Sequence, residues 1–244
     1  MVACGTSSYA CRVARFWFEK LANIPVNMDI ASEYRYRNIL HSDKELVIFI
    51  SQSGETIDTI ACLEEVKKKK INTFSIVNVA DSSIARLSDE TILTQAGPEI
   101  GVASTKAFTT QLITLLILAI KLGVIKKNIS LTEEQKLVNE IIEIPSLMKN
   151  TLDNETKIRG IASEIYTAKD VLYLGRGESH AIALEGALKL KELSYLHAEG
   201  YPAGEMKHGP LALIEDGMPV VVIAPRDQHY KKTISNMQEV IARG

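Results

Sequence analysis

Hydroxyl side chains gather directly after an apolar segment of the chain, in residues 51–56, which read Ser-Gln-Ser-Gly-Glu-Thr. Residues 46–50 before them are all apolar, as in a buried strand, and a helical pattern follows from residue 57. A strand-to-helix turn of this kind directs hydroxyls and free backbone N–H groups to one spot, where the helix dipole favours negative charge. We call residues 51–56 the second hydroxyl turn. It predicts a phosphate site, with ordinary helix capping by Ser and Thr as the alternative.

A similar turn lies at the start of the chain. Apolar residues 2–4 run into Gly-Thr-Ser-Ser at residues 5–8, the first hydroxyl turn, and a helical pattern starts near residue 9. Two such turns converge on one ligand if their strands flank a topological switch point of a parallel sheet. The chain lacks the Gly-Lys-Ser/Thr ending of a nucleoside triphosphate loop and the G-x-G-x-x-G dinucleotide motif. Hydroxyls in place of a lysine indicate a monophosphate ester, and a sugar phosphate is the natural candidate.

A second group of residues suited to chemistry lies in residues 183–193. At 100° per residue, Glu185, Lys189 and Glu192 fall within roughly 60° of one another on a helix otherwise rich in Leu and Ala. A ladder of surface ion pairs is the simpler explanation. Because leucines lie on several sides of this helix, we favour an enclosed site in which Glu192 and Lys189 form a base and acid pair.

Residues 197–210 contain three glycines and two prolines, which predict a tightly turned loop carrying several titratable groups. His208 lies in this segment, and taken alone it is more simply a structural histidine. We expect structural roles for His41 and His229, and the sequence leaves His180 and His197 undecided.

The strand and helix patterns alternate along the chain. Strands are predicted at residues 2–4, 26–30, 46–50 and 72–77, and helices at residues 9–22, 32–40, 57–70 and 105–122. Strands separated by helices predict parallel βαβ units in an α/β sandwich.

A polar helical segment, residues 131–167, follows and is expected to break at Pro145. The first pattern then restarts, with strands at residues 171–174 and 220–224 and helices from residue 180 and over residues 228–243, so we predict an internal duplication. The predicted domains are residues 1–125, a helical connector at 126–168, and an incomplete second copy at 169–244. The abrupt start and end predict a piece of a longer polypeptide.

Composition excludes several classes of function. The chain has 244 residues, 46% hydrophobic and 24% charged, and its net charge of −2 argues against nucleic acid as a partner. Cys4, Cys11 and Cys62 lack metal-ligand spacing, which fits a reducing compartment. The apolar run at residues 112–122 is too short to span a bilayer, so no membrane partner is expected, and we predict a helix buried between layers.

Five segments resemble the isomerase half of glutamine:fructose-6-phosphate aminotransferase, also called glucosamine-6-phosphate synthase, which consists of two sugar isomerase (SIS) domains. They are residues 4–7, 51–56, 101–111, 183–192 and 204–210, in the order of the family. The resemblance implies a duplicated SIS-type three-layer α/β/α sandwich with a parallel sheet. It also implies conversion of fructose 6-phosphate and ammonia to glucosamine 6-phosphate in cytoplasmic amino-sugar biosynthesis, without metal or cofactor.

The resemblance also implies roles for individual residues. Glu192 would move a proton between C1 and C2 of the sugar imine, Lys189 would assist at the C2 hydroxyl, and His208 would help to open the ring from the neighbouring subunit of a homodimer. The residues that would contact the sugar phosphate are Thr6, Ser7, Ser51, Gln52, Ser53, Thr56 and, through its backbone, Val102.

The family's glutaminase half and its lysine-bearing C-terminal tail have no counterpart in this sequence. We therefore expect the chain by itself to leave glutamine intact and to aminate sugar inefficiently. Two alternatives stay open: another SIS enzyme acting on fructosyl-amines or amino sugars, and a sugar-phosphate-binding module without catalysis. The second alternative assigns nothing to Glu192.

Overall fold

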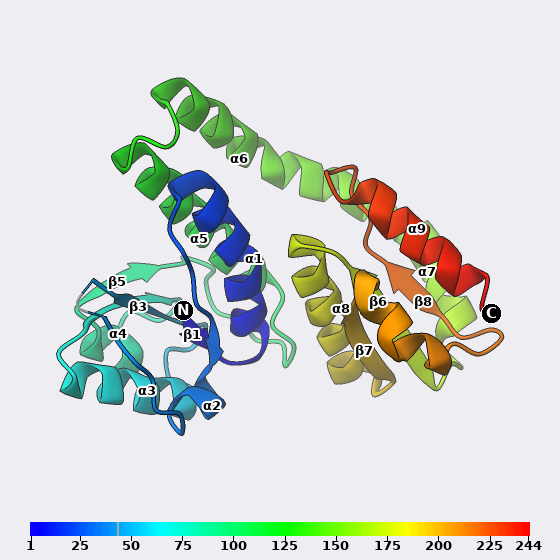
Figure 1. Cartoon of the computed structure of the whole chain (residues 1–244), viewed down its shortest axis with the longest axis horizontal. Helices are drawn as coiled ribbons and strands as arrows, with labels where there is room; N and C mark the ends of the chain where they lie inside the picture. Colours follow the sequence, from blue (N-terminus) through cyan, green and yellow to red (C-terminus); the bar gives the residue numbers. More distant parts are fainter. Residues whose placement is uncertain (43) are drawn as a thin grey trace. The chain divides into compact units, whose positions relative to one another are not determined.

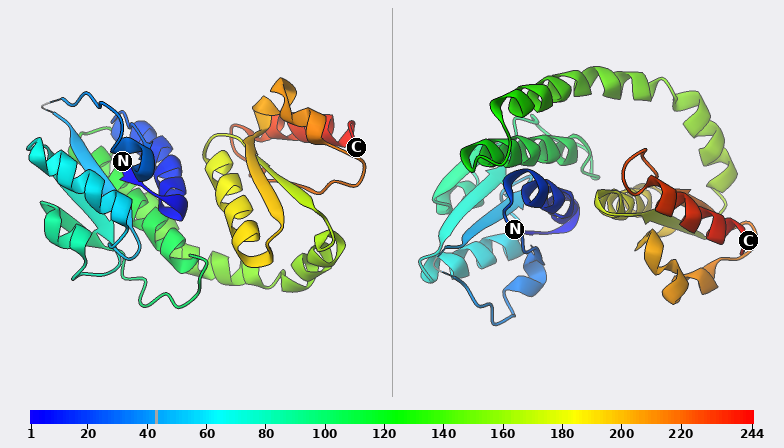
Figure 2. Two further views of the ribbon diagram at one scale, coloured as in Figure 1. Left: turned by 90° about the horizontal axis from the view of Figure 1, so that it is seen from below. Right: turned by 45° about the horizontal axis from the view of Figure 1, so that its top comes forward.

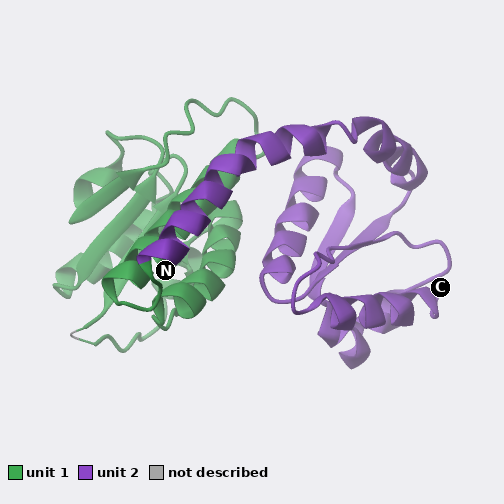
Figure 3. Ribbon diagram, turned by 90° about the horizontal axis from the view of Figure 1, so that it is seen from above, with its two compact units in different colours: residues 1–130 green, residues 131–244 purple. Residues whose placement is uncertain are grey.

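The computed structural model describes residues 1–42 and 44–244, which divide into two compact units, residues 1–130 and 131–244 (Figure 3). Each unit contains its own sheet. The three-part division at residues 125 and 168 remains a prediction.

The first unit is a five-stranded parallel sheet with helices on both faces (Figures 1 and 2). The strand order β2-β1-β3-β4-β5 places β1 beside β3, which is the switch point that the two hydroxyl turns require. Helices α1 and α5 pack side by side on one face, and α3 and α4 cover the other. The elements are β1 (Val2–Ala3), α1 (Gly5–Ala22), β2 (Asp29–Ile30), α2 (Ala31–Tyr34), β3 (Leu46–Ser51), α3 (Ile57–Lys68), β4 (Asn72–Val77), α4 (Ser83–Leu87), β5 (Glu90–Leu93) and α5 (Lys106–Ile125).

Strand β3 is buried on both faces, as expected for a central strand between two helical layers. Val47 and Phe49 belong to one core cluster with Leu63 and Val66 of α3. Because side chains alternate along a strand, the intervening β3 residues face the layer of α1 and α5. The continuous apolar run that predicted this strand is thus explained by its central place in the sheet.

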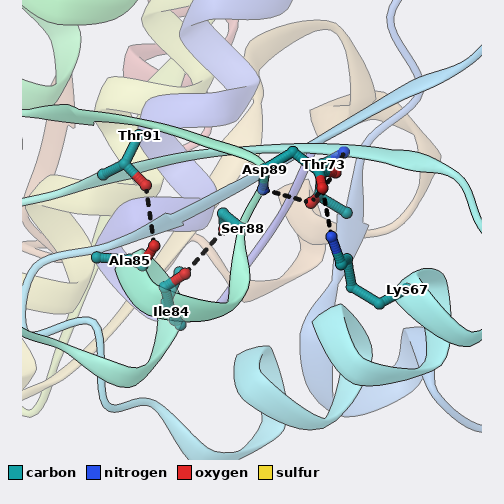
Figure 4. A network of polar contacts seen from close by, with 7 residues as sticks. All are labelled: Lys67, Thr73, Ile84, Ala85, Ser88, Asp89 and Thr91. Atoms are coloured by element: carbon teal, nitrogen blue, oxygen red, sulfur yellow. Dashed lines mark hydrogen bonds and ion pairs between the residues drawn. The ribbon is translucent and has the colours of Figure 1, made fainter.

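The carboxylate of Asp89 joins the end of α3 to the edge of the sheet (Figure 4). It accepts hydrogen bonds from Thr73 of β4, through the backbone N at 2.8 Å and Oγ1 at 2.7 Å, and it forms an ion pair with Lys67 of α3. The hydrogen bond from Lys67, followed by those from Thr73, lowers the pKa of Asp89 to about 2. The ionised carboxylate therefore stabilises the packing of α3 on β4.

The second unit repeats the central part of the first. Its parallel sheet has the order β7-β6-β8, which corresponds to β2-β1-β3, and the predicted α/β duplication is confirmed. Helix α8 packs on one face of β6, while η1 and α9 share a core cluster with the other face. The elements are α6 (Leu131–Leu152), α7 (Glu155–Ile165), β6 (Asp170–Gly175), α8 (Glu178–Ser194), β7 (His197–Pro202), η1 (Ala203–His208), η2 (Pro210–Leu213), β8 (Val220–Val222) and α9 (Tyr230–Ile241).

The predicted loop at residues 197–210 is wrong. Residues His197–Pro202 form strand β7, which pairs with β6, and two 3₁₀ helices follow. Gly200 has a packing role, because a Cβ there would lie 2.9 Å from the Cα of Leu184 on α8. The glycine lets helix and strand approach closely, and it therefore does not mark a turn.

Other boundaries also differ from the predictions. Helix α1 begins at Gly5, so the first hydroxyl turn is the first helical turn itself, and α4 and β5 were not predicted. Helix α6 continues through Pro145. Because α6 has no buried residue among those described, the carbonyl that loses its helical partner at the proline remains accessible to water.

Helix α5 is longer than its apolar core and is only partly buried. By length and composition alone, Lys106–Ile125 is apolar enough to cross a membrane, contrary to the expectation from residues 112–122. Its buried side includes Leu115 and Ala119 and packs on α1, whereas Ile117 on the other side is 50% exposed. The prediction of all-round burial is therefore wrong for the described chain.

Candidate functional site

The two hydroxyl turns start side by side at the carboxyl edge of the first sheet. Strand β1 pairs with β3 in the register Val2↔Phe49 and Ala3↔Ile50, so Cys4 and Ser51 follow at the same level. Helices α1 and α3 begin there, and neither N-cap residue, Cys4 nor Thr56, caps its helix through its side chain. These N-terminal N–H groups lie at the carboxyl edge of a switch point, which is the usual place for an anion in this type of sheet.

Hydrogen bonds within the second hydroxyl turn hold its side chains in place. The Gly54 N–H donates to Ser51 Oγ at 3.1 Å, and Ser51 Oγ shares a hydrogen bond of 2.9 Å with Thr56 Oγ1. The Glu55 N–H donates to Ser53 Oγ at 3.1 Å. Gly54 has φ +68°, a left-handed conformation that glycine adopts without strain. The turn is thus held by its own backbone before any ligand binds.

The acidic residue of this turn, Glu55, is directed to another element. Its carboxylate accepts a hydrogen bond of 2.7 Å from the backbone N of Ser83 at the start of α4, and this bond lowers the pKa of Glu55. The negative charge within the second hydroxyl turn is therefore bound to α4.

The first hydroxyl turn is supported by a residue that we did not predict. Gln111 of α5 is 1% exposed, and its Nε2 donates to Ser7 Oγ at 3.0 Å. Ser8 Oγ donates to the carbonyl of Gly5 at 2.7 Å and is committed to the helix, whereas Thr6 is half-buried. The sequence feature that could have drawn attention to Gln111 is a polar amide within an otherwise strongly apolar helix.

Val102 and Gln52 lie on loops of the first unit. Val102 is 97% exposed in the segment between β5 and α5, and the Gln52 carbonyl accepts a hydrogen bond of 3.1 Å from the N of Asn78. The segment of Val102 is attached to α5 by Glu99, whose Oε1 accepts hydrogen bonds from the backbone N of Thr105 at 2.9 Å and of Ala107 at 3.4 Å. Sugar contacts of Val102 and Gln52 remain predictions.

The corresponding edge of the second unit has different side chains. Glu178 occupies the first turn of α8, where its negative charge suits the helix dipole. Arg176 in the preceding turn donates from Nη1 to Asn236 Oδ1 of α9 at 3.0 Å. This switch point thus carries its own acid and a committed arginine, and the paired hydroxyl turns belong to the first unit.

The charged stripe of α8 forms an ion-pair ladder. Lys189 Nζ lies 3.4 Å from Glu185 Oε1 and 2.6 Å from Glu192 Oε2. The exposed fractions of the side chains rise along the ladder, at 7% for Glu185, 19% for Lys189 and 34% for Glu192. The ion pairs expected from the helical spacing are present. The ladder is buried at Glu185, as expected for an enclosed site, and accessible at Glu192.

The histidines have different surroundings. His208 ends the 3₁₀ helix η1 and is exposed. His41 pairs with Glu45 at 3.1 Å, and His197 with Asp170 at 2.6 Å. His229 is the N-cap residue of α9, and His180 is half-buried in α8. Within residues 1–42 and 44–244, no three His, Cys, Asp or Glu side chains are grouped to hold a metal ion.

The comparison with known families agrees with this architecture. The family model described as SIS domain matches residues 1–121 and 164–244, which are most of both units. The chain belongs to the SIS domain family. The residues between the two matched segments include α6 and most of α7.

Relatives within the family are similar over the whole chain. A glutamine–fructose-6-phosphate aminotransferase (isomerizing) of Bradyrhizobium diazoefficiens is 57% identical over all 244 residues, which correspond to 40% of that protein. The solved C-terminal domain of glucosamine-fructose-6-phosphate aminotransferase from Francisella tularensis is 47% identical, with a TM-score of 0.97, over 100% of this chain and 69% of that one. The resemblance to the isomerase half is therefore confirmed.

A more distant solved structure shares the fold. Glucosamine-6-phosphate deaminase from Thermotoga maritima is 24% identical with a TM-score of 0.82, over 100% of this chain and 72% of that one. The chain spans 40% of the length of the curated relatives it matches. The SIS family and fold of the chain are thus shown.

Proposed function

We propose that this chain is the sugar-isomerising part of a glutamine–fructose-6-phosphate aminotransferase, which forms glucosamine 6-phosphate from fructose 6-phosphate and ammonia. The observation that carries this proposal is the pair of hydroxyl turns at the β1/β3 switch point, with the uncapped N-termini of α1 and α3 behind them. The 57% identity to a relative with that name supports the choice of substrate.

The phosphate is proposed to bind to Thr6 and Ser7 of the first hydroxyl turn and to Ser51, Gln52, Ser53 and Thr56 of the second. Hydroxyl and backbone donors suit a monophosphate ester, because each of its terminal oxygens accepts several hydrogen bonds. Holding the phosphate restricts the motion of the sugar and so lowers the entropic cost of its reaction. The backbone of Val102 is proposed to contact the sugar.

The ladder on α8 is proposed to carry the proton transfer. Glu192, at the accessible end, takes a proton from C1 of the sugar imine and returns it at C2. Lys189 assists at the hydroxyl on C1, since C2 carries the imine nitrogen. Lys189 is well placed to stabilise negative charge there because Glu185 anchors it from the buried end. Glu185 thus supports the acid and base pair without contacting the sugar.

Ring opening is assigned to His208, acting across the interface of a homodimer. The exposure of His208 at the end of η1 is compatible with reaching a neighbouring subunit. We place the protein in the cytoplasm, since Cys4, Cys11 and Cys62 are all free thiols. In this proposal the ammonia comes from a glutaminase domain, which the longer relatives have room for.

Two measurements test these assignments. Isothermal titration calorimetry with fructose 6-phosphate should give one site per chain, and Ser51→Ala should weaken binding about tenfold, as expected for a lost hydrogen bond to a charged group. The matched control is Ser42→Ala, which removes an exposed hydroxyl elsewhere in the unit. Equal affinity of Ser51→Ala and the wild type would reject the phosphate site.

The catalytic assignment needs a separate readout. In D₂O with ammonia present, the wild-type chain should catalyse the replacement of a C1 proton of fructose 6-phosphate by deuterium, which proton NMR detects. Glu192→Gln should abolish this exchange while the sugar phosphate still binds. The exposed Glu205→Gln serves as the control for the loss of one carboxylate. Exchange that continues unchanged in Glu192→Gln would reject Glu192 as the base, whereas no exchange with the wild type would favour a binding module without catalysis.

A further inference from the structure

The buried amide of Gln111 is a polar group in a place where an apolar side chain would pack more simply. It lies in α5, is 1% exposed, and reaches Ser7 in the first turn of α1. Its other amide atom, Oε1, is also buried, and within residues 1–42 and 44–244 it has no hydrogen-bond partner. An unpaired buried acceptor lowers stability, so the presence of the amide calls for a reason other than packing.

The direction of the hydrogen bond supplies that reason. Gln111 Nε2 donates to Ser7 Oγ, and a hydroxyl oxygen that accepts from a protein donor still has its own hydrogen to donate. Gln111 is the hydrogen-bond partner of the Ser7 hydroxyl among the residues described, so that hydrogen is not used within the protein. The hydroxyl lies at the N-terminus of α1, where an anion is favoured.

The second hydroxyl turn follows the same rule. Ser51 Oγ accepts from the Gly54 N–H, and Ser53 Oγ accepts from the Glu55 N–H. Ser51 Oγ also shares a hydrogen bond with Thr56 Oγ1, so this pair of hydroxyls has one hydrogen left for a ligand. In both turns, therefore, serine oxygens are occupied by protein donors before a ligand arrives. Such an arrangement presents hydrogens and suits a ligand group that only accepts, as the fully ionised phosphate of a sugar ester does.

We propose that Gln111 is a positioning residue for phosphate recognition, which sets the Ser7 hydroxyl as a donor toward the ligand and selects the dianionic form of the phosphate. The inference rests on the proposed phosphate site at the β1/β3 edge. Gln111 acts through Ser7 and does not itself touch the sugar phosphate in this scheme. In this scheme the unpaired Oε1 of Gln111 lowers the stability of the protein, while its Nε2 keeps the Ser7 hydroxyl oriented as a donor.

Binding and stability of two Gln111 variants test the proposal on the 244-residue chain. Gln111→Met removes the donor and the unpaired acceptor together, so it should weaken fructose 6-phosphate binding several-fold, up to about tenfold, while the melting temperature stays the same or rises. A purely structural amide would instead lower the melting temperature. Thr114→Val on the same helix is the control, because the Thr114 hydroxyl bonds to the Thr110 carbonyl at 2.8 Å.

Gln111→Glu adds a pH readout. An ionised carboxylate accepts the Ser7 hydrogen and turns it away from the ligand, whereas the protonated carboxyl donates as the amide does. Burial favours the protonated form, so the affinity relative to wild type should be low at pH 8 and recover toward pH 6. Using the ratio to wild type at each pH removes the titration of the phosphate ester itself, whose second pKa is about 6.

The outcomes separate this inference from the proposed function. Gln111→Met that binds like wild type while Ser7→Ala binds more weakly would overturn the role of Gln111 and leave the phosphate site in place. A pH-independent ratio for Gln111→Glu would overturn it as well, even if Gln111→Met fails to fold. If the wild-type chain does not bind fructose 6-phosphate, or if Ser7→Ala and Ser51→Ala both bind normally, the proposed function fails and the inference with it.

Discussion

Replacing Gly54 by alanine tests whether the second hydroxyl turn is held rigidly by its surroundings. Gly54 has φ +68° and is buried in the turn. An added Cβ would overlap the Oγ and Cβ of Ser82 and would lie 3.5 Å from Val77 Cγ1. Ser82 is 1% exposed and caps α4 by accepting from the N of Ala85 at 3.4 Å, so it has little room to move.

Two effects lower the free energy of unfolding in Gly54→Ala. A left-handed conformation costs an alanine about 1 kcal/mol or slightly more. Displacing the buried Ser82 adds an overpacking cost of about 2 kcal/mol, part of which is the lost cap. We therefore expect Gly54→Ala to lower the free energy of unfolding of the first unit by about 3 kcal/mol. At about 3 °C per kcal/mol, the melting temperature should fall by roughly 10 °C.

Gly97→Ala is the matched control, because Gly97 also has φ +68° while its nearest neighbour to an added Cβ is Lys106 Nζ at 3.9 Å. This variant should lose only the conformational cost of about 1 kcal/mol. Differential scanning calorimetry of both variants, following the transition of the first unit, measures the difference. Equal losses in Gly54→Ala and Gly97→Ala would show that the turn gives way easily, and the view of a preformed phosphate site would be refuted.

Two further predictions concern residues that support the first unit. Asp89→Asn should lower the free energy of unfolding at pH 7 by about 1 kcal/mol or less, since Asp89 is 43% exposed and solvent screens its pair with Lys67. The pKa of Asp89 in the folded protein, about 2, lies below the ordinary 3.8. Urea titrations should therefore show the full stability difference between wild type and variant above pH 4, and the difference should disappear toward pH 2. Glu99→Ala should cost about 1 kcal/mol by uncapping α5 and should increase amide exchange at Thr105, and unchanged exchange there would contradict this capping role.

The sequence predicted the parallel sheet well where local and tertiary preferences agree. Strand β4 was predicted with its observed bounds. Strand β3, a central strand with a continuous apolar run, was predicted one residue short of its observed end. Strand β7 could not be recognised in the same way. Its glycine and proline are typical of turns, but the segment pairs with β6 and Gly200 packs closely on Leu184, so an extended strand forms there.

Some parts of the candidate site could be predicted from the sequence and others could not. The two hydroxyl turns follow from strand and helix patterns alone, and the register of β1 on β3 agrees with their predicted proximity. The contact of Gln111 with Ser7 could not be predicted, since the two residues are 104 positions apart in the chain and no local pattern links them. The ladder on α8 was predicted from helical spacing, but its graded burial depends on the sheet that α8 covers.

The duplication shows why a fold of this kind does not by itself define a ligand site. Both units place a helix N-terminus at the edge of a central strand, so both offer the same backbone geometry to an anion. In the second unit, Glu178 already supplies negative charge there and Arg176 is bound to Asn236. In the first unit, no acidic residue lies in the first turn of α1, and Ser7 is held by Gln111. Asp58 in the first turn of α3 is paired with Arg35 at 3.4 Å. The difference between the two edges thus depends on a few side chains, and in the proposed function these make the first unit the one that binds phosphate.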